Sequence, residues 1–154
     1  MTEFSAARAL RGFAIAPKRA AARGINESTK GQGARVLLVD DEDSVQQVLC
    51  GMLEFAGYEV LQAKDGEEAI NEFRARGAEI DCVLLDLSMP KLDGDEAFSE
   101  LKKLRSDVRV ILSSGFTERQ VLSRFEGEGL AGVIQKPARM HVLLEKIALA
   151  LKSL

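Results

Sequence analysis

The sequence predicts an α/β fold in which five strands form one parallel sheet covered by helices on both faces. Short apolar runs, often rich in branched residues, alternate along the chain with longer segments of helical periodicity. Four of these runs also lead directly into a polar residue, and these residues are Asp40, Asp86, Ser113 and Lys136. Because the carboxyl ends of parallel strands meet at one edge, where open α/β sheets bind ligands, we expect these side chains to lie close together.

The composition is that of one ordinary globular domain. The chain has 154 residues, of which 46% are hydrophobic and 29% charged. No apolar stretch approaches the roughly 18 residues that a membrane-spanning helix needs, so we expect no membrane contact and a cytoplasmic location. Cys50 and Cys82 lie within apolar patterns, where thiols are usually buried and, in the cytoplasm, reduced.

The charge of the chain is divided unevenly between two segments. Residues 1–33 carry six basic and two acidic residues, a net charge of +4, which leaves −7 for residues 34–154. The first segment lacks sustained periodicity, so we expect a disordered or linker-like basic extension ahead of one folded domain. Its composition also overlaps with that of organelle transit peptides. The acidic domain disfavours nonspecific binding to nucleic acid, whose phosphates attract basic surfaces.

The domain is predicted to begin with a strand, a helix and a second strand. Arg35–Val39 is a short branched apolar run, typical of a strand buried on both faces. Apolar residues recur at helical spacing over residues 45–56, and Gly57 ends that helix. Residues 58–62 form the second predicted strand.

The middle of the domain is predicted to contain a capped helix and the third strand. Asp65 is a candidate N-cap with Glu68 as its capping-box partner, which starts a helix through Arg76. The third strand covers residues 80–86, and residues 88–94 form a loop with two turn-forming dipeptides.

The last part of the domain is predicted to contain three helices and two strands. A helix over residues 95–104 precedes a strand over residues 108–112. Thr117 caps a polar helix that runs to residue 125, and residues 131–135 form the fifth strand. The final helix places one apolar face toward the core, made by Met140, Leu143, Leu144, Ile147 and Leu151.

The adjacent carboxylates of Asp40 and Asp41 indicate a site for a hard cation. Two neighbouring acids repel each other unless they hold a cation such as Mg²⁺, which prefers oxygen ligands. We expect Asp41 and Asp86 to be direct ligands, with the backbone carbonyl of Ser88, and Asp40 to orient a metal-bound water. The alternative is that the acidic pair only complements the N-terminus of the first helix.

Asp86 is the candidate phosphoryl acceptor. It ends a buried strand, where an unpaired carboxylate is costly, and a metal together with Lys136 would keep it ionised and nucleophilic. Attack on a phosphoryl donor would give an aspartyl phosphate. Ser114 could bond a phosphoryl oxygen, and a cis bond before Pro137 would aim Lys136 over the sheet edge. Taken singly, Ser114 could be a loop serine, and Lys136 an exposed residue before a helix-opening proline.

Residues 34–154 resemble the receiver domain of two-component response regulators. The resemblance rests on Val-Asp-Asp-Glu at 39–42, Leu-Leu-Asp-Leu-Ser-Met-Pro-Lys-Leu-Asp-Gly at 84–94, Ser-Ser-Gly at 113–115 and Gln-Lys-Pro at 135–137. It implies a flavodoxin-like fold with strand order 2-1-3-4-5.

The resemblance also implies the roles of the site residues. Asp86 would accept a phosphoryl group from a histidine kinase or histidine phosphotransfer protein, with Mg²⁺ required. Asp40 and Asp41 would be the acidic metal pair, Ser114 the switch hydroxyl and Lys136 the phosphate-contacting lysine. In style the sequence is closest to the C-terminal receivers of hybrid sensor kinases.

One position departs from the family pattern. The family usually has Tyr or Phe three residues before the lysine, and this chain has Val133. The usual coupling between hydroxyl and aromatic ring is therefore not expected. We expect activation to run through the loop after Ser114 and the helix that follows it.

The expected function is that of a stand-alone signalling module and not of an enzyme. The residues after 112 leave room for only two helices and one strand, so no DNA-binding output domain fits. Output is expected through a partner on the face made by the helix over residues 117–125, the fifth strand and the last helix. A homodimer could use the same face. The alternatives are a receiver-like scaffold that takes no phosphate and an Asp-nucleophile phosphatase of the haloacid dehalogenase type.

Overall fold

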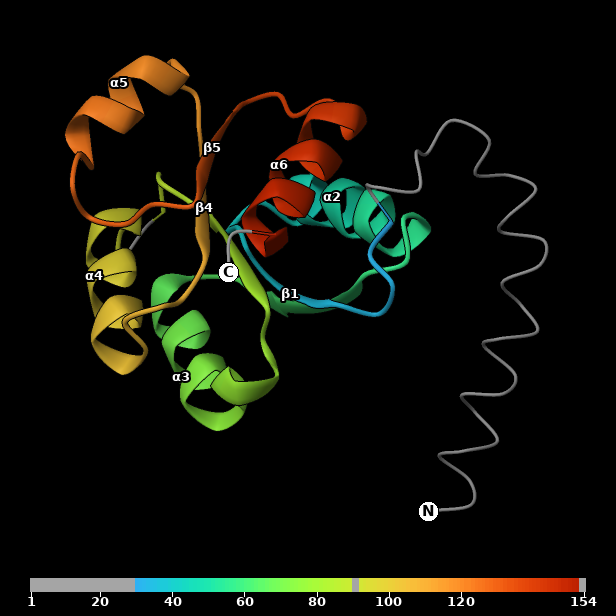
Figure 1. Cartoon of the computed structure of the whole chain (residues 1–154), viewed down its shortest axis with the longest axis horizontal. Helices are drawn as coiled ribbons and strands as arrows, with labels where there is room; N and C mark the ends of the chain where they lie inside the picture. Colours follow the sequence, from blue (N-terminus) through green and yellow to red (C-terminus); the bar gives the residue numbers. More distant parts are fainter. Residues whose placement is uncertain (1–29, 90–91, 153–154) are drawn as a thin grey trace.

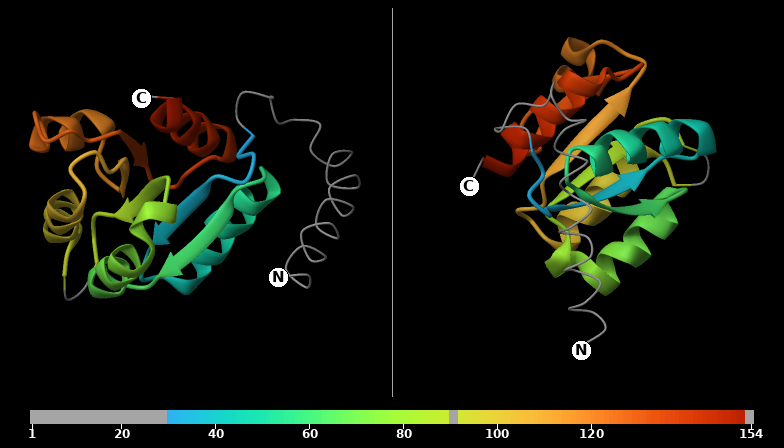
Figure 2. Two further views of the ribbon diagram at one scale, coloured as in Figure 1. Left: turned by 60° about the horizontal axis from the view of Figure 1, so that its bottom comes forward. Right: turned by 90° about the vertical axis from the view of Figure 1, so that its right-hand side faces the viewer.

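The strands form one parallel sheet with the order β2-β1-β3-β4-β5. The structure is a computed structural model and describes residues 30–89 and 92–152. Figure 2 shows the strands side by side, with helices on either side of them. The observed order is the one expected of a flavodoxin-like fold. The strands are β1 (Arg35–Val39), β2 (Glu59–Ala63), β3 (Cys82–Asp86), β4 (Val110–Ser114) and β5 (Gly132–Gln135).

The helices form a layer on each face of this sheet (Figure 1). Side chains of α2 and α6 share one core cluster with alternate strand residues, and those of α3, α4 and α5 share the other. A 3₁₀ turn, η2 (Gly77–Glu79), precedes β3. The helices are α2 (Asp43–Phe55), α3 (Gly66–Arg76), α4 (Gly94–Leu104), α5 (Glu118–Arg124) and α6 (Met140–Lys152).

The central strands are buried on both faces, as their continuous apolar runs predict. In β1, Leu37 belongs to the core under α3, α4 and α5, and Leu38 belongs to the core under α2 and α6. Both side chains are no more than 1% exposed. Alternate residues of a strand point to opposite faces, so one apolar run fills two cores.

Two predicted helix starts are confirmed by their caps. The Asp65 side chain accepts a hydrogen bond from the Glu68 amide at 2.8 Å, and α3 begins at the next residue. Thr117 and Gln120 form the reciprocal capping box that starts α5. These caps satisfy amide groups that have no partner within the first turn of the helix.

Strand ends differ from the sequence-based bounds by up to two residues. The 3₁₀ turn delays β3 to Cys82, and β4 runs over Val110–Ser114 and not over residues 108–112. Ser113 belongs to β4 because it pairs in register with both neighbouring strands, and Ser114 belongs to it because it pairs with Gln135 of β5. Polarity suggested a loop there, but tertiary pairing overrides local propensity.

The expected basic extension, residues 1–33, lies mostly outside the described residues. Its last residues contact the domain, because the Gly31 amide donates to the Ala56 carbonyl at 2.7 Å and the Gly33 amide donates to Gly57 at 2.9 Å. A Cβ atom at Gly31 would lie 2.5 Å from the Tyr58 ring, so only glycine permits this approach. A domain start at residue 34 stays a prediction.

Both cysteines are free and buried, in agreement with their apolar surroundings in the sequence. Burial raises the pKa of Cys82 to about 12, which makes its thiol unreactive. Within residues 30–89 and 92–152, no helix combines the length and the apolar character needed to cross a membrane.

Candidate functional site

Three carboxylates meet at the carboxyl ends of β1 and β3. Asp40, Asp41 and Asp86 each offer one oxygen, and these oxygens lie within 4.8 Å of one another. The two strands end level because Val39 pairs with Leu85. Asp40 is 1% exposed and Asp86 2%, whereas Asp41 is exposed. The acidic cluster therefore consists of two buried carboxylates and one that is open to solvent.

A similar local turn holds each of the two buried carboxylates. Oδ1 of Asp40 accepts a hydrogen bond from the Glu42 amide at 2.9 Å, and Oδ1 of Asp86 accepts one from the Ser88 amide at 3.1 Å. Aspartate commonly bonds the backbone two residues ahead in this way. Ser88 thus approaches Asp86 through its amide, and the use of its carbonyl as a ligand stays a prediction.

Lys136 brings a positive charge to this acidic cluster. Its Nζ lies 3.1 Å from Oδ2 of Asp86 and 3.5 Å from Oδ2 of Asp40. Its amide donates to the Ser114 carbonyl at 2.7 Å, which anchors the end of β5 to β4. The Lys136–Pro137 peptide bond is cis, the geometry that the sequence left as a candidate. One ammonium group is therefore shared by two buried carboxylates.

Burial and charge pairing act against each other on the pKa values of this ion pair. Burial raises the pKa of Asp86 above its ordinary value, and the Ser88 amide and Lys136 offset this only in part. Burial lowers the pKa of Lys136, but attraction to Asp86 and hydrogen bonding with it, together with Asp40, leave that pKa above its usual value. The ionised form of Asp86 is thus only partly compensated by Lys136, and a further cation would favour it.

The donor chemistry of the acidic cluster fits a hard divalent cation such as Mg²⁺. All the candidate side-chain ligands are carboxylate oxygens, and exposed Asp41 lets an ion there keep water molecules. Softer metals would favour imidazole or thiolate ligands. The acidic cluster is therefore a candidate metal site.

Ser114 and Val133 lie on the face of the sheet opposite to that of Asp86. Oγ of Ser114 accepts a hydrogen bond from the Phe116 amide at 3.0 Å. Val133 is 1% exposed and shares a core with Val121 and Phe125 of the α5 region. Among the described residues, no hydrogen bond joins the Ser114 hydroxyl to Asp86. The structure thus brings Asp40, Asp41, Asp86 and Lys136 together and leaves the Ser114 side chain to one side.

Sequence reasoning missed Gln46, which supports the acidic pair. This residue is 4% exposed, and its amide group donates to the Ala63 carbonyl at 2.8 Å. The same carbonyl accepts the Asp40 amide at 3.1 Å, so Gln46 fixes α2 to the turn that carries Asp40. The available signal was a polar residue at the helical spacing of buried Leu49 and Leu53.

Comparison with known proteins identifies the family. The model of the response regulator receiver domain matches residues 36–148. The chain is 33% identical over 129 residues to the sensor kinase CckA of Brucella abortus, covering 83% of this chain and only 14% of that protein. It is 30% identical over 127 residues to the chemotaxis protein CheY of Treponema pallidum, covering 82% of this chain and 88% of that one.

A solved structure agrees with this assignment. CheY in a CheX–CheY–BeF₃–Mg²⁺ complex from Borrelia burgdorferi superposes with a TM-score of 0.71 at 32% identity, covering 81% of this chain and 93% of that one. The sheet order, the acidic cluster and the sequence match point to the same family. This chain therefore belongs to the response regulator receiver domains, which are signalling domains of two-component systems.

Proposed function

We propose that residues 34–154 act in the cytoplasm as a phosphorylation-switched receiver in which Asp86 accepts a phosphoryl group. The donor would be a phosphohistidine of a histidine kinase or of a histidine phosphotransfer protein. One observation carries the proposal. Nζ of Lys136 lies 3.1 Å from Asp86 and 3.5 Å from Asp40, next to three clustered carboxylates. This is the combination of nucleophile and positive charge that phosphoryl transfer requires.

The transfer is a displacement at phosphorus. A carboxylate oxygen of Asp86 attacks the phosphorus atom, and the bond from phosphorus to the imidazole nitrogen of the donor breaks. The bonding electrons leave with the imidazole, and Asp86 becomes an acyl phosphate. Lys136 then turns from the carboxylate to the phosphoryl oxygens, and Asp40 keeps the ammonium group over the site.

The proposed cation is Mg²⁺, held by Asp41, Asp86 and the Ser88 carbonyl, with Asp40 acting through a bound water. Three carboxylate oxygens within 4.8 Å support this choice. When bound, Mg²⁺ offsets negative charge on the transferring oxygens. Asp41, the exposed member of the set, would give the ion access from solvent.

The signal would leave the site through the loop after Ser114. In this proposal the Ser114 hydroxyl gives up its bond from the Phe116 amide, which is 3.0 Å long here, and turns to a phosphoryl oxygen. That change would move the segment that leads into α5. Val133 has no aromatic ring that could move, which favours the loop after Ser114 and α5 as the route of the signal.

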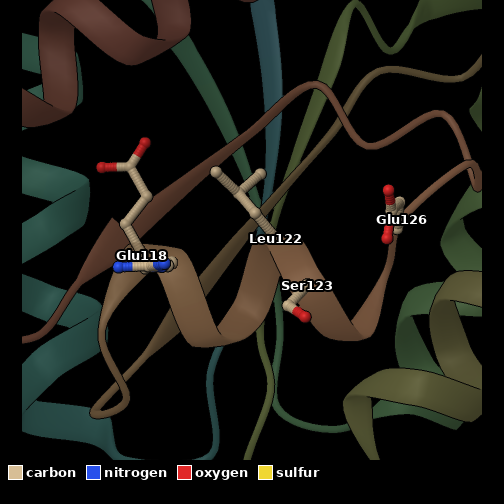
Figure 3. A pocket seen from close by; sticks show the side chains of 5 residues that line it. Glu118, Leu122, Ser123 and Glu126 are labelled. Carbon is tan, nitrogen blue, oxygen red and sulfur yellow. The ribbon is translucent and has the colours of Figure 1, made fainter.

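The partner surface would be the face made by α5, β5 and α6. Figure 3 shows Leu122 on the outside of α5 with Glu118, Ser123 and Glu126 around a shallow hollow. Leu122 is 46% exposed, and Glu118 pairs with Lys146 of α6 at 2.7 Å. An apolar group surrounded by charges suits a protein partner or a second copy of this chain.

Phosphorylation of the full chain by acetyl phosphate tests the proposal. We expect Mg²⁺-dependent addition of one phosphoryl group, seen by intact mass and mapped to Asp86, and none with a chelator. Asp86→Asn should abolish the adduct, whereas Asp107→Asn, an exposed position, should not. Absence of any adduct would favour a scaffold that takes no phosphate. Steady hydrolysis of phosphate esters would favour an enzyme.

A further inference from the structure

Ser113 is a buried residue whose hydroxyl the proposed reaction does not use. It is 3% exposed and pairs in register with Asp86 in the neighbouring strand. Within the described residues its hydroxyl makes no hydrogen bond to another side chain or to the backbone. Its oxygen is not one of the buried, unpaired side-chain atoms of the described residues, so it keeps some contact with solvent and is available as a donor.

Strand alternation places Ser113 on the same face of the sheet as Asp86. Leu84 and Ile111, two residues before Asp86 and Ser113, both belong to the core under α2 and α6. Side chains two residues apart share a face, and neighbouring strands lie about 4.8 Å apart. The two side chains are therefore lateral neighbours, whereas Ser114 lies on the opposite face with Leu112 and Val133.

The bonds of the Asp86 carboxylate indicate at which step the Ser113 hydroxyl could replace a lost partner. Oδ1 already accepts the Ser88 amide, and Oδ2 lies 3.1 Å from Nζ of Lys136. When the ammonium turns to the phosphoryl oxygens, the carboxyl group loses that partner. Ser113, the in-register neighbour of Asp86 on the same face of the sheet, carries a hydroxyl that can donate in its place.

We propose that the Ser113 hydroxyl donates a hydrogen bond to the carboxyl group of phosphorylated Asp86 and thereby speeds loss of the phosphoryl group. This inference rests on the proposed function. In hydrolysis a water oxygen attacks phosphorus, the bond from phosphorus to the Asp86 oxygen breaks, and its electrons return to the carboxylate. The water proton passes to solvent. A donor beside the carboxylate stabilises the charge that develops on the leaving oxygen.

A matched pair of variants separates the effect of the Ser113 hydroxyl from the effect of side-chain shape. Ser113→Thr and Ser113→Val add nearly the same bulk, but only threonine keeps the hydroxyl. The full-length variants are phosphorylated with acetyl phosphate and Mg²⁺ and freed of the donor, and the phosphorylated fraction is followed by intact mass. We expect Ser113→Val to lose the phosphoryl group about two- to tenfold more slowly than wild type, and Ser113→Thr to keep the wild-type rate.

The controls separate this inference from the proposed function and from a packing effect. Ser113→Ala, which adds no bulk, should slow the loss as Ser113→Val does, and the Mg²⁺ dissociation constant measured by calorimetry should be unchanged in all three variants. Equal rates for the threonine and valine variants, or a weaker Mg²⁺ affinity in the valine variant alone, would overturn the role of the hydroxyl. Failure of the wild-type chain to take up phosphate would overturn both proposals.

Discussion

Asp86 lies where an ionised carboxylate is only partly compensated. Burial raises its pKa, and the Ser88 amide and Lys136 do not cancel that effect. Between the ordinary pKa of an aspartate and this raised value, the folded state binds more protons than the unfolded state. The contribution of Asp86 to stability therefore falls as pH rises through that window, and the full penalty is present above it.

Replacement of Asp86 by asparagine should consequently stabilise the free protein. We expect the melting temperature of Asp86→Asn to be a few degrees above that of wild type at neutral pH, and this difference to shrink as pH falls below the window. Thermal unfolding over a pH series measures both effects. Asp107→Asn, at a position 86% exposed, is the control and should change little. A neutral-pH melting temperature below that of wild type would contradict this account.

Gly94, the first residue of α4, shows how an element is positioned against the site. A Cβ atom there would lie 2.6 Å from Cα of Leu87 and 2.9 Å from the Asp86 carbonyl oxygen. These contacts are with backbone, so no side chain can move to relieve them. The absence of a side chain at Gly94 thus lets α4 begin directly beside the strand that carries Asp86.

Alanine substitution at two helical glycines should give opposite results. Gly94→Ala should destabilise the fold by about 1–3 kcal/mol, because the new methyl group would overlap backbone. Gly51→Ala, in α2 with nothing within 4 Å of its Cβ position, should stabilise by about 0.5–1 kcal/mol through helix propensity. Urea unfolding measures the two free energies. Similar changes in unfolding free energy for both variants would contradict the overlap with backbone at Gly94.

Val133, which stands where the family usually has an aromatic ring, is expected to support folding and not phosphate uptake. It is 1% exposed, so Val133→Ala should leave a cavity and cost about 1–3 kcal/mol of stability. Uptake of phosphate at Asp86 should stay intact, because Val133 lies in the core on the opposite face of the sheet. Intact mass after acetyl phosphate treatment, with folding checked by circular dichroism, decides this. A folded variant that takes up no phosphate would show a direct role for Val133.

Across the whole molecule, cation binding and folding should be coupled. A ligand that binds only the folded state stabilises it, by about 2.7 kcal/mol at a hundred times its dissociation constant. We expect Mg²⁺ to raise the melting temperature progressively, since it would also favour the ionised form of buried Asp86. Asp41→Asn should remove this response with little change in the metal-free protein, because Asp41 is exposed.

The matched control for this coupling is Glu42→Gln, the next residue, which is also exposed and is not part of the acidic cluster. Its Mg²⁺ response should equal that of wild type. An equal response from Asp41→Asn would place the cation elsewhere on the acidic domain.

The pattern of amino acids was sufficient to predict the sheet, its helical layers and most of the site. Short continuous apolar runs rich in branched residues favour strands buried on both faces, and polar residues at the carboxyl ends of parallel strands meet at one edge. Asp40, Asp41, Asp86 and Lys136 came together for that reason. The caps at Asp65 and Thr117 were also predictable, because capping depends on residues a few positions apart.

The faces on which Ser113 and Ser114 lie were decided by tertiary pairing. The sequence placed the end of the fourth strand at residue 112, whereas pairing with β3 and β5 extends it to Ser114. A loop serine has no defined face, but a strand residue does, and adjacent strand residues point in opposite directions. Long-range hydrogen bonding therefore decided which hydroxyl stands beside Asp86, and a local sequence pattern contains no information about those bonds.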